Sequence, residues 1–227
     1  MTGRSRRALA RELESLADFT DPSPALEQYL TPPEIAAHIT HLAGLQADLE
    51  GPVVDLGTGT GMLAIAAALA GADRVVGVDL DRDALELARE NAASVDRAAA
   101  VDWVQGTVTP HSLPLAPSET DVGFEGEGGN ENENEGGVTV LSNPPFGAQR
   151  GNRHADRTFL ETARSIATVS YTIHNEGSQE FVESFAADEG GTVTHAFQAA
   201  FPIDRRFEFH TEASTELAAE VFRIEWS

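Results

Sequence analysis

Short runs of β-branched and apolar residues alternate along the chain with longer stretches in which apolar residues recur every three or four positions. The first pattern is typical of buried strands and the second of amphipathic helices. We predict strands at about residues 52–56, 74–79, 100–105, 138–142, 168–174, 191–200 and 220–226, with helices at about 32–48, 61–70, 82–93, 156–167 and 178–188.

This alternation predicts an α/β fold with a seven-stranded, mostly parallel sheet and helices on both faces. The last two strands follow each other without a long helix, so we expect antiparallel pairing and an antiparallel edge strand at one side of the sheet. The N-terminal segment MTGRSRRALARELESLADF has the periodicity of an amphipathic helix and opens a helical extension over about residues 1–31. A single domain over residues 1–227 is expected.

One segment breaks the alternation. Residues 116–137 contain seven acidic residues, six glycines and no basic residue. Such a segment is too polar to bury and too flexible to order at low entropic cost. We expect a solvated, disordered insertion between two strands; an autoinhibitory mimic of RNA or a partner-binding tail are the alternatives.

The charge balance is strongly acidic. The 227 residues include 37 acidic and 15 basic ones, all of the latter arginine, for a net charge of −22. At low salt this charge would repel nucleic acids and anionic membranes. A lysine-free, acidic surface is also typical of a halophilic protein, and in ~1 M salt the Debye length is only about 3 Å. We favour the halophilic interpretation, in which local features decide the partners.

Several classes of protein are excluded. The chain has no cysteine, so disulfides, cysteine-ligated zinc and a thiol nucleophile are ruled out. No apolar run reaches the ~20 residues of a membrane span, and acidic residues stand where a signal peptide would be apolar. None of the seven histidines has the spacing of a metal site. His174 and Tyr171, near a strand end, could border a pocket, but structural roles are expected for them. A cytoplasmic protein without a metal is expected.

A glycine-rich turn follows the first predicted strand. The sequence VVDLGTGTG at residues 53–61 leads from a strand into a helix, and its glycines allow a tight turn and close approach of a ligand. The spacing differs from the G-x-G-x-x-G of dinucleotide sites, and Asp55 before the glycines disfavours a phosphate. A ligand with an amino group fits Asp55 better.

Asp79 closes the next predicted strand, where a carboxylate can accept both hydroxyls of a ribose. A nucleoside that carries an amino acid satisfies Asp55, Asp79 and the glycines together, and S-adenosylmethionine (SAM) is such a molecule. Taken singly, a glycine turn is a weak signal, and Asp79 could instead cap the following helix.

The sequence Asn143-Pro144-Pro145-Phe146 follows the strand VTVLS. Two prolines fix the backbone and remove two N–H donors, so the loop presents carbonyl acceptors. An –NH2 group could donate one proton to the Asn143 side-chain oxygen and one to the Pro144 carbonyl, while a flat base stacks on Phe146. The alternative is that the prolines merely end a strand and Phe146 fills the core.

These motifs resemble those of the class I SAM-dependent methyltransferases in which an [N/D]-P-P-[F/Y/W] motif acts on a planar amino or amide nitrogen. More narrowly, LEQYLTP, DLGTGTG, VGVDLDRDALELARENA, NPPFGAQRG, FLETA and YTIH resemble the archaeal and eukaryotic rRNA adenine-N6 methyltransferases of the small subunit. The likeness spans about residues 12–227 apart from the acidic segment. It implies a Rossmann-like fold, SAM as cofactor and N6 methylation of an adenine in RNA.

The resemblance also implies roles for individual residues. The segment around Tyr29 closes over the cofactor, and the NPPF residues hold the adenine. Thr107 stands where relatives commonly have an acid that contacts the cofactor's adenine, so weaker cofactor binding is expected. The expected cofactor-binding residues are Gln28, Tyr29, Thr31, Asp55, Gly57, Thr58, Gly59, Gly61, Asp79, Leu80, Thr107 and Asn143, and the catalytic residues are Asn143, Pro144, Pro145 and Phe146.

Relatives of this group are stabilised as a heterodimer by a small zinc-ribbon activator protein that pairs with an edge strand. The predicted strand near residues 100–105 offers Val101, Trp103 and Val104 for such pairing. Alternatively, Trp103 packs inward beneath a helix.

Arginines gather in two places. Arg150, Arg153 and Arg157 follow the NPPF motif, where a nucleic-acid backbone would pass, and we expect Arg150 and Arg153 to bind the RNA together with Phe146. The N-terminal arginines 4, 6, 7 and 11 can equally form a solvated helix face.

Two other functions stay open from the sequence. A glutamine-N5 methyltransferase of the release-factor type uses the same Asn-Pro-Pro turn on an amide, although it usually carries Tyr in place of Phe146. A degenerate cofactor fold could also serve as a non-catalytic scaffold.

Overall fold

The computed structural model describes residues 4–95, 101–110, 137–145, 155–203 and 215–227. Almost all of the acidic segment 116–137 lies outside these described residues, as do Phe146, Arg150 and Arg153. Within the described residues, no helix is long and apolar enough to cross a membrane.

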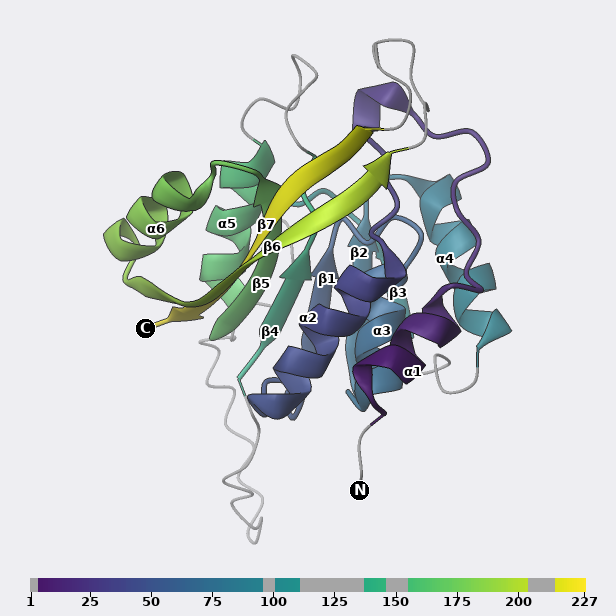
Figure 1. The fold of residues 1–227 in the computed structure, drawn as a ribbon, viewed down its shortest axis with the longest axis horizontal. Coiled ribbons are helices and arrows are strands. Elements are labelled where there is room, and N and C mark those ends of the chain that lie inside the picture. The colour runs from purple at the N-terminus through teal and green to yellow at the C-terminus, as the bar shows by residue number, and fades with distance from the viewer. Residues whose placement is uncertain (1–3, 96–100, 111–136, 146–154, 204–214) are drawn as a thin grey trace, which may run out of the picture.

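A seven-stranded sheet forms the centre of the molecule (Figure 1). Its order is β3-β2-β1-β4-β5-β7-β6, so β3 and β6 form the two edges. β7 pairs antiparallel with both β5 and β6, whereas the first five strands are parallel. The strands are β1 (Val53–Leu56), β2 (Val75–Asp79), β3 (Val101–Gln105), β4 (Thr139–Ser142), β5 (Val169–Asn175), β6 (Gly191–Ile203) and β7 (Thr215–Trp226).

The predicted strands and helices are confirmed, most of them within one or two residues. The antiparallel strand is β7, which lies one position in from the edge, because β6 folds back along its outer side. The helices are α1 (Arg6–Leu13), α2 (Pro33–Leu45), α3 (Met62–Ala70), α4 (Arg82–Ser94), α5 (Ala155–Ile166) and α6 (Gln179–Asp188), with a 3-10 turn η1 (Pro24–Leu26) before α2.

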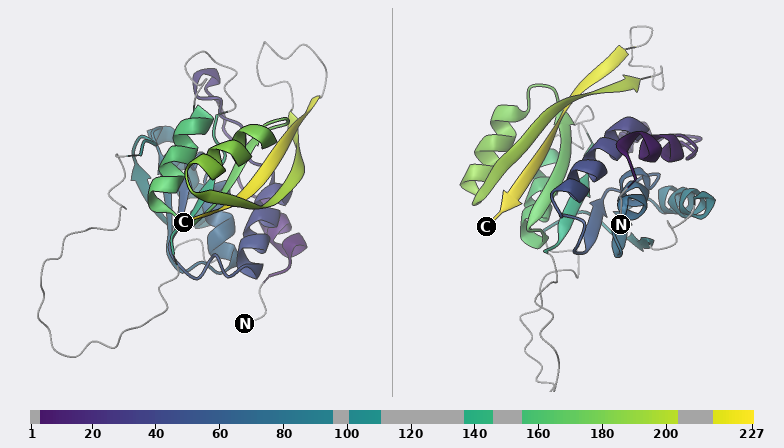
Figure 2. Two further views of the ribbon diagram at one scale, coloured as in Figure 1. Left: turned by 90° about the vertical axis from the view of Figure 1, so that its left-hand side faces the viewer. Right: turned by 60° about the horizontal axis from the view of Figure 1, so that its bottom comes forward.

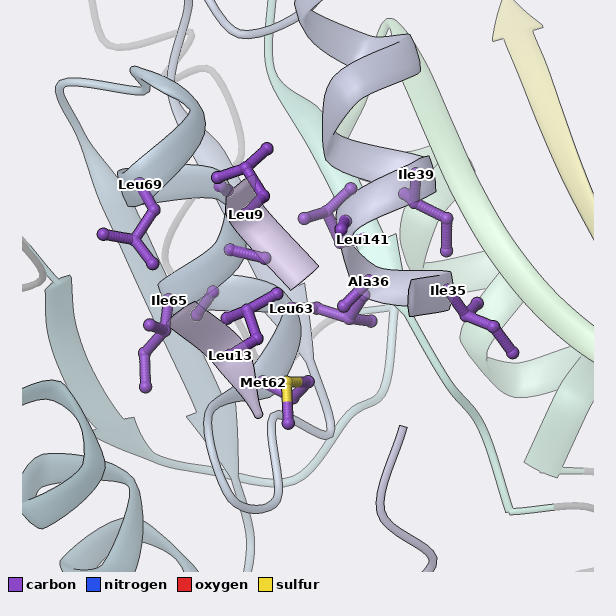
Figure 3. Packing of buried hydrophobic residues seen from close by; sticks show 14 of the residues in the cluster. Leu9, Leu13, Ile35, Ala36, Ile39, Met62, Leu63, Ile65, Leu69 and Leu141 are labelled. Atoms are coloured by element: carbon purple, nitrogen blue, oxygen red, sulfur yellow. The ribbon is translucent and has the colours of Figure 1, made fainter. Parts of the chain in front are cut away.

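The main core lies between α1, α2, α3 and one face of the sheet (Figure 3). Leu9 and Leu13 of α1 are buried against α3, and Ile39 of α2 is buried beside them. The N-terminal helix is therefore an integral part of the core, since its apolar stripe is removed from water. On the other face of the sheet, α5 covers Val54 and Val140, and α6 packs near β7.

β6 and β7 form a ribbon that extends beyond the end of β5 (Figures 1 and 2). Their 13 and 12 residues contrast with the 7 residues of β5. The end of this ribbon lies above α2, and Phe197 of β6 stacks on His38 of α2 with ring centroids 4.2 Å apart. The ribbon thus reaches the segment that leads into α2.

Candidate functional site

A cavity of about 350 Å³ opens at the carboxyl ends of β1, β2 and β4, where parallel α/β sheets bind ligands. Its volume lies in the range of small-molecule sites. We call it the sheet-end cavity. It is lined by Phe19, Leu26, Glu27, Gln28, Tyr29, Gly57, Gly59, Asp79, Leu80, Thr107, Val108, Asn143, Pro145, Ala155, Thr158 and Phe159.

The glycine turn brings backbone close to this cavity. Gly57 and Gly59 have φ angles of +67° and +53°, which side chains other than hydrogen rarely tolerate. A Cβ on Gly57 would lie 3.0 Å from the Phe159 ring, and one on Gly59 would lie 3.2 Å from Phe19. The turn therefore lets two aromatic rings from α5 and the N-terminal segment pack directly over the end of β1.

Gly61 has a different role from the other two glycines. It does not line the sheet-end cavity, and a Cβ there would lie 2.8 Å from the Trp103 ring of β3. Trp103 is half-buried against Gly61 and Gly77. Of the two alternatives for Trp103, inward packing is confirmed, and the structure places Gly61 against that ring, away from the cavity.

Asp55 lies buried beneath the turn. Its Oδ2 accepts hydrogen bonds from the Thr58 hydroxyl at 2.6 Å and from the Ala64 amide at 3.0 Å. Burial raises the pKa of Asp55 to about 7, because a carboxylate loses its solvation there. Its Oδ1 is buried and has no hydrogen-bond partner among the described residues.

Asp55 and Thr58 face a small annex of about 30 Å³ beside the sheet-end cavity. The annex shares Tyr29, Gly57 and Asn143 with the larger cavity. Asp55 therefore does not line the sheet-end cavity itself, as the sequence suggested, but lies behind it at the annex. A ligand's amino group would reach the unpaired Oδ1 of Asp55 through the annex.

Asp79 lines the sheet-end cavity directly. Its Oδ2 accepts from the Gly59 amide at 2.8 Å and its Oδ1 from the Asp81 amide at 2.9 Å. Burial raises the pKa of Asp79, against the lowering effect of these two amides. Each carboxylate oxygen keeps a further lone pair for a ligand hydroxyl. Leu80 and Thr107 lie beside it on the cavity wall.

The segment before α2 covers the cavity. The Gln28 side chain donates to Asp81 at 2.8 Å and accepts from the Ser23 amide at 2.7 Å, which ties the segment to the end of β2. Tyr29 lines both cavities, and burial and then the nearby Glu27 raise its pKa. The predicted closing segment is therefore held over the glycine turn.

Asn143 brings β4 into the same cavity. Its side-chain amide donates to the Thr31 hydroxyl at 3.0 Å, and this bond fixes the orientation of the amide group. The Asn143 Oδ1 is buried and has no hydrogen-bond partner among the described residues. An unpaired buried acceptor is costly, which is typical of a site that awaits a donor. Pro145 lines the cavity, and Pro144 between them is buried.

Several cavity residues were not predicted from the sequence. Phe19, Glu27, Thr158 and Phe159 line the cavity, and Glu27 is buried with a φ of +49°. They come from the N-terminal segment and from α5, which only the fold brings together. The buried Phe159 of the FLETA run and the run LEQY itself were the available signals.

His174 and Tyr171 lie outside the cavity, and their structural roles are confirmed. The Thr172 hydroxyl links the Ser142 hydroxyl at 3.1 Å to His174 Nε2 at 2.9 Å, in a buried chain beneath the turn that holds Asn143. Burial lowers the pKa of His174 to about 4, so this ring is neutral at pH 7.

Comparison with known proteins places the glycine turn within a methyltransferase family profile. The sequence profile of the family described as ribosomal protein L11 methyltransferase (PrmA) matches residues 38–113. This range contains the glycine turn and Asp79 and stops before the NPPF motif.

Relatives that match over nearly the full length of the chain belong to a different group from the PrmA profile. The chain is 36% identical over 220 residues to an uncharacterized protein of Methanocaldococcus jannaschii, covering 97% of this chain and 94% of that protein. It is 33% identical to the rRNA N(6)-adenosine-methyltransferase Mettl5 of Drosophila melanogaster, covering 96% and 95%.

The fold agrees with these matches. The crystal structure of a candidate RNA methyltransferase from Pyrococcus horikoshii superposes with a TM-score of 0.79 at 31% identity, covering 100% of this chain and 99% of that one. With end-to-end similarity of sequence and fold, and with Asn143 and Pro145 in the sheet-end cavity, the chain belongs to the rRNA N6-adenosine methyltransferase family.

Proposed function

We propose that the protein transfers the methyl group of SAM to N6 of an adenine in RNA, with small-subunit rRNA as the substrate. One observation carries this proposal. The unpaired Oδ1 of Asn143 lies in the same cavity as Gly57, Gly59 and Asp79, so an acceptor for a flat amine adjoins a nucleoside-sized site.

The residues of the cavity fit SAM. Asp79 offers lone pairs to ribose hydroxyls, and the free Oδ1 of Asp55 in the annex suits an ammonium group. Gly57 and Gly59 admit a ligand close to the backbone, with Gln28 and Tyr29 covering it. When bound, SAM supplies an electrophilic methyl group to the lone pair of the amine nitrogen, which then loses its proton to water.

The chain contributes chiefly by positioning. Asn143 Oδ1 accepts a hydrogen bond from one N–H of the adenine N6 amine, and the Pro144 carbonyl accepts a hydrogen bond from the other. Both bonds strengthen as the nitrogen becomes tetrahedral and its lone pair is freed. Thr31 keeps the Asn143 oxygen, rather than its NH2 group, facing the substrate. Phe146, Arg150 and Arg153 remain predicted contacts of the base and the RNA backbone.

We further propose that a small activator protein pairs with the free edge of β3. Support comes from the edge position of β3 and from Val104, which is 41% exposed. Val101 is buried and Trp103 turned inward, so pairing would use the backbone of β3 and the outer face around Val104. If the protein alone is monodisperse, stable and fully active, an obligatory activator is ruled out.

The activity is tested with small-subunit rRNA from a strain that lacks this protein. We expect labelled methyl from SAM to appear as N6-methyladenosine in nucleoside mass spectrometry, with release factor as a control substrate. Asn143→Ala should slow formation of the product about 10²- to 10³-fold while SAM still binds. Label in release factor alone, or N6-methyladenosine made equally well by Asn143→Ala, would contradict the proposal.

A further inference from the structure

A second cavity, of about 560 Å³, lies between α1, α2 and β6 and shares no residue with the sheet-end cavity. We call it the arginine groove. Its charged and aromatic lining residues are Arg6, Arg7, Arg11, Glu14, Glu34, His38 and Phe197. Figure 1 shows α1 and α2 side by side, with the β6–β7 ribbon above α2.

Three arginines of the N-terminal group face this groove. Arg6, Arg7 and Arg11 are exposed, and none of them makes an ion pair within the described part of the chain. Arg4 is different, since it pairs with Glu12 at 3.0 Å and donates to the Leu69 carbonyl at 3.0 Å. Against these three guanidinium groups the lining holds two carboxylates, Glu14 and Glu34, so the groove carries a net charge of +1 in a chain whose net charge is −22.

An aromatic pair forms another part of the lining. The half-buried rings of His38 and Phe197 stack at 4.2 Å with an interplanar angle of 26°. Burial and then the nearby Arg6 lower the pKa of His38, so the ring is neutral at pH 7. The groove therefore combines guanidinium groups, which bind phosphates in a bidentate manner, with aromatic surface on which a base can stack.

The groove is close to the site of methyl transfer. α2 begins two residues after Thr31, which holds Asn143, and His38 follows about one and a half turns later. At 1.5 Å per helical residue, His38 lies about 7.5 Å along the helix axis from the start of α2. A polymer with one nucleotide at Asn143 can therefore continue past the first turns of α2 into the groove.

We propose that the arginine groove binds the RNA strand that flanks the target adenine, with Arg7 and Arg11 on phosphates and the His38–Phe197 pair against a neighbouring base. This inference rests on the proposed function. An acidic peptide would satisfy the arginines but would leave the aromatic pair without a planar partner, so RNA fits the combination better.

The test compares two matched double variants of the full-length protein. Arg7→Gln with Arg11→Gln removes two charges from the groove. Arg74→Gln with Arg164→Gln removes the same number of exposed charges elsewhere, just before β2 and near the end of α5, although Arg164, unlike the groove arginines, also loses an ion pair with Glu189. RNA affinity is measured by fluorescence anisotropy at several salt concentrations, and SAM affinity by calorimetry.

For the groove variant we expect at least a tenfold loss of RNA affinity, with SAM affinity and the rate at saturating RNA unchanged. The slope of log affinity against log salt should become shallower by about 1.5, because each lost phosphate contact removes about 0.7–0.9. The control variant should keep the slope of the unmodified protein. Phe197→Leu should weaken binding about fivefold without changing the slope, since stacking releases no counterions.

Different failures are distinguishable. Equal losses in both double variants would show a net-charge effect and overturn the groove. Unchanged RNA affinity in the groove variant, with methylation intact, would overturn the groove and leave the proposed function standing. Competition by poly-glutamate as strong as by RNA, with no effect of Phe197→Leu, would assign the groove to an acidic peptide instead. No RNA methylation by the unmodified protein with the activator protein supplied would remove the proposed function itself.

Discussion

Two buried polar clusters lie on different strands of the same sheet, and they differ in how completely their atoms are paired. Around Arg223 of β7, the guanidinium group donates to Asp48 at 2.8 and 2.9 Å, and Asp48 also accepts from the Tyr171 hydroxyl at 2.5 Å. Around Asn143 and Asp55, one oxygen of each side chain has no partner among the described residues.

The paired cluster therefore has a structural role, and the unpaired cluster has the features of a ligand site. In the Arg223 cluster the charged groups pair with each other, and hydrogen bonding to Asp48 raises the pKa of Arg223, so the guanidinium group stays ionised. Such a cluster joins β5, β7 and the loop before β1. The Asn143 cluster keeps acceptors unpaired at a cost to stability, which is explained if a ligand supplies the missing donors.

The largest effect is expected in the satisfied cluster. Arg223→Met leaves the Asp48 carboxylate buried without its charge partner and should lower the free energy of unfolding by about 3–5 kcal/mol. Urea denaturation measures this loss. The double variant Arg223→Met with Asp48→Leu should recover much of it. If Arg223→Met alone is as stable as the unmodified protein, the Arg223 cluster does not stabilise the fold and the contrast with the Asn143 cluster is wrong.

In the unpaired cluster, a change should affect activity rather than stability. Asn143→Ala removes the acceptor for the substrate amine and should reduce kcat about 10²- to 10³-fold. The melting temperature should stay within a few degrees, because no satisfied bond across the sheet is lost apart from that to Thr31. Circular dichroism beside single-turnover methylation checks both. An Asn143→Ala variant that is less stable but has a normal rate would show that Asn143 stabilises the fold and does not act in catalysis.

Thr31 offers a finer test of the same cluster. Thr31→Val removes the acceptor that orients the Asn143 amide, while the volume of the buried side chain is kept. We expect kcat to fall about tenfold, since about 1.4 kcal/mol of positioning is lost, with KM for SAM little changed. Thr31→Ser, which keeps the hydroxyl, is the control and should retain most of the rate. Equal rates for the valine and serine variants would exclude the positioning role.

The smallest effect concerns pH. Asp55 has a pKa of about 7 when buried, so below pH 7 it is protonated and must lose its proton to pair with an ammonium group. SAM affinity should therefore fall five- to tenfold as pH drops from 7.5 to 6, as measured by calorimetry. Asp55→Asn should show no such dependence. A pH-independent affinity in the unmodified protein would place the amino group elsewhere.

A second pH effect concerns the stability of the fold and comes from His174. Its pKa is about 4 in the folded protein, below the ordinary value of 6.5. Between these values the unfolded chain binds more protons, so His174 makes the protein less stable as pH falls from 6.5 towards 4. His174→Gln should make that decline shallower in urea titrations, and an unchanged decline would assign it to other groups.

Much of the fold could be predicted because the local pattern and the tertiary structure agree. Alternation of apolar runs with helical periodicity located the strands, and the NPPF and glycine motifs located the two halves of the site on β4 and β1. What could not be predicted depends on packing between distant segments. Gly61 serves the packing of Trp103, and Phe19 and Phe159 reach the cavity from segments that are far apart in the sequence.

The N-terminal arginines illustrate the same limit. Sequence periodicity places them on the polar side of α1, where solvated charges are the ordinary outcome. Only the position of β6 next to α2 turns that side into the wall of a groove. A hydrophobic pattern predicts which face of a helix is polar and which is apolar, but it does not predict which other element lies opposite each face.

The account depends most on where the substrate amine lies. A crystal structure with a non-reactive SAM analogue and an adenine-containing oligonucleotide measures this directly. We predict the adenine N6 at about 3 Å from both Asn143 Oδ1 and the Pro144 carbonyl oxygen, with the analogue's ribose on Asp79. An adenine bound away from Asn143, with that oxygen still unpaired, would contradict the account.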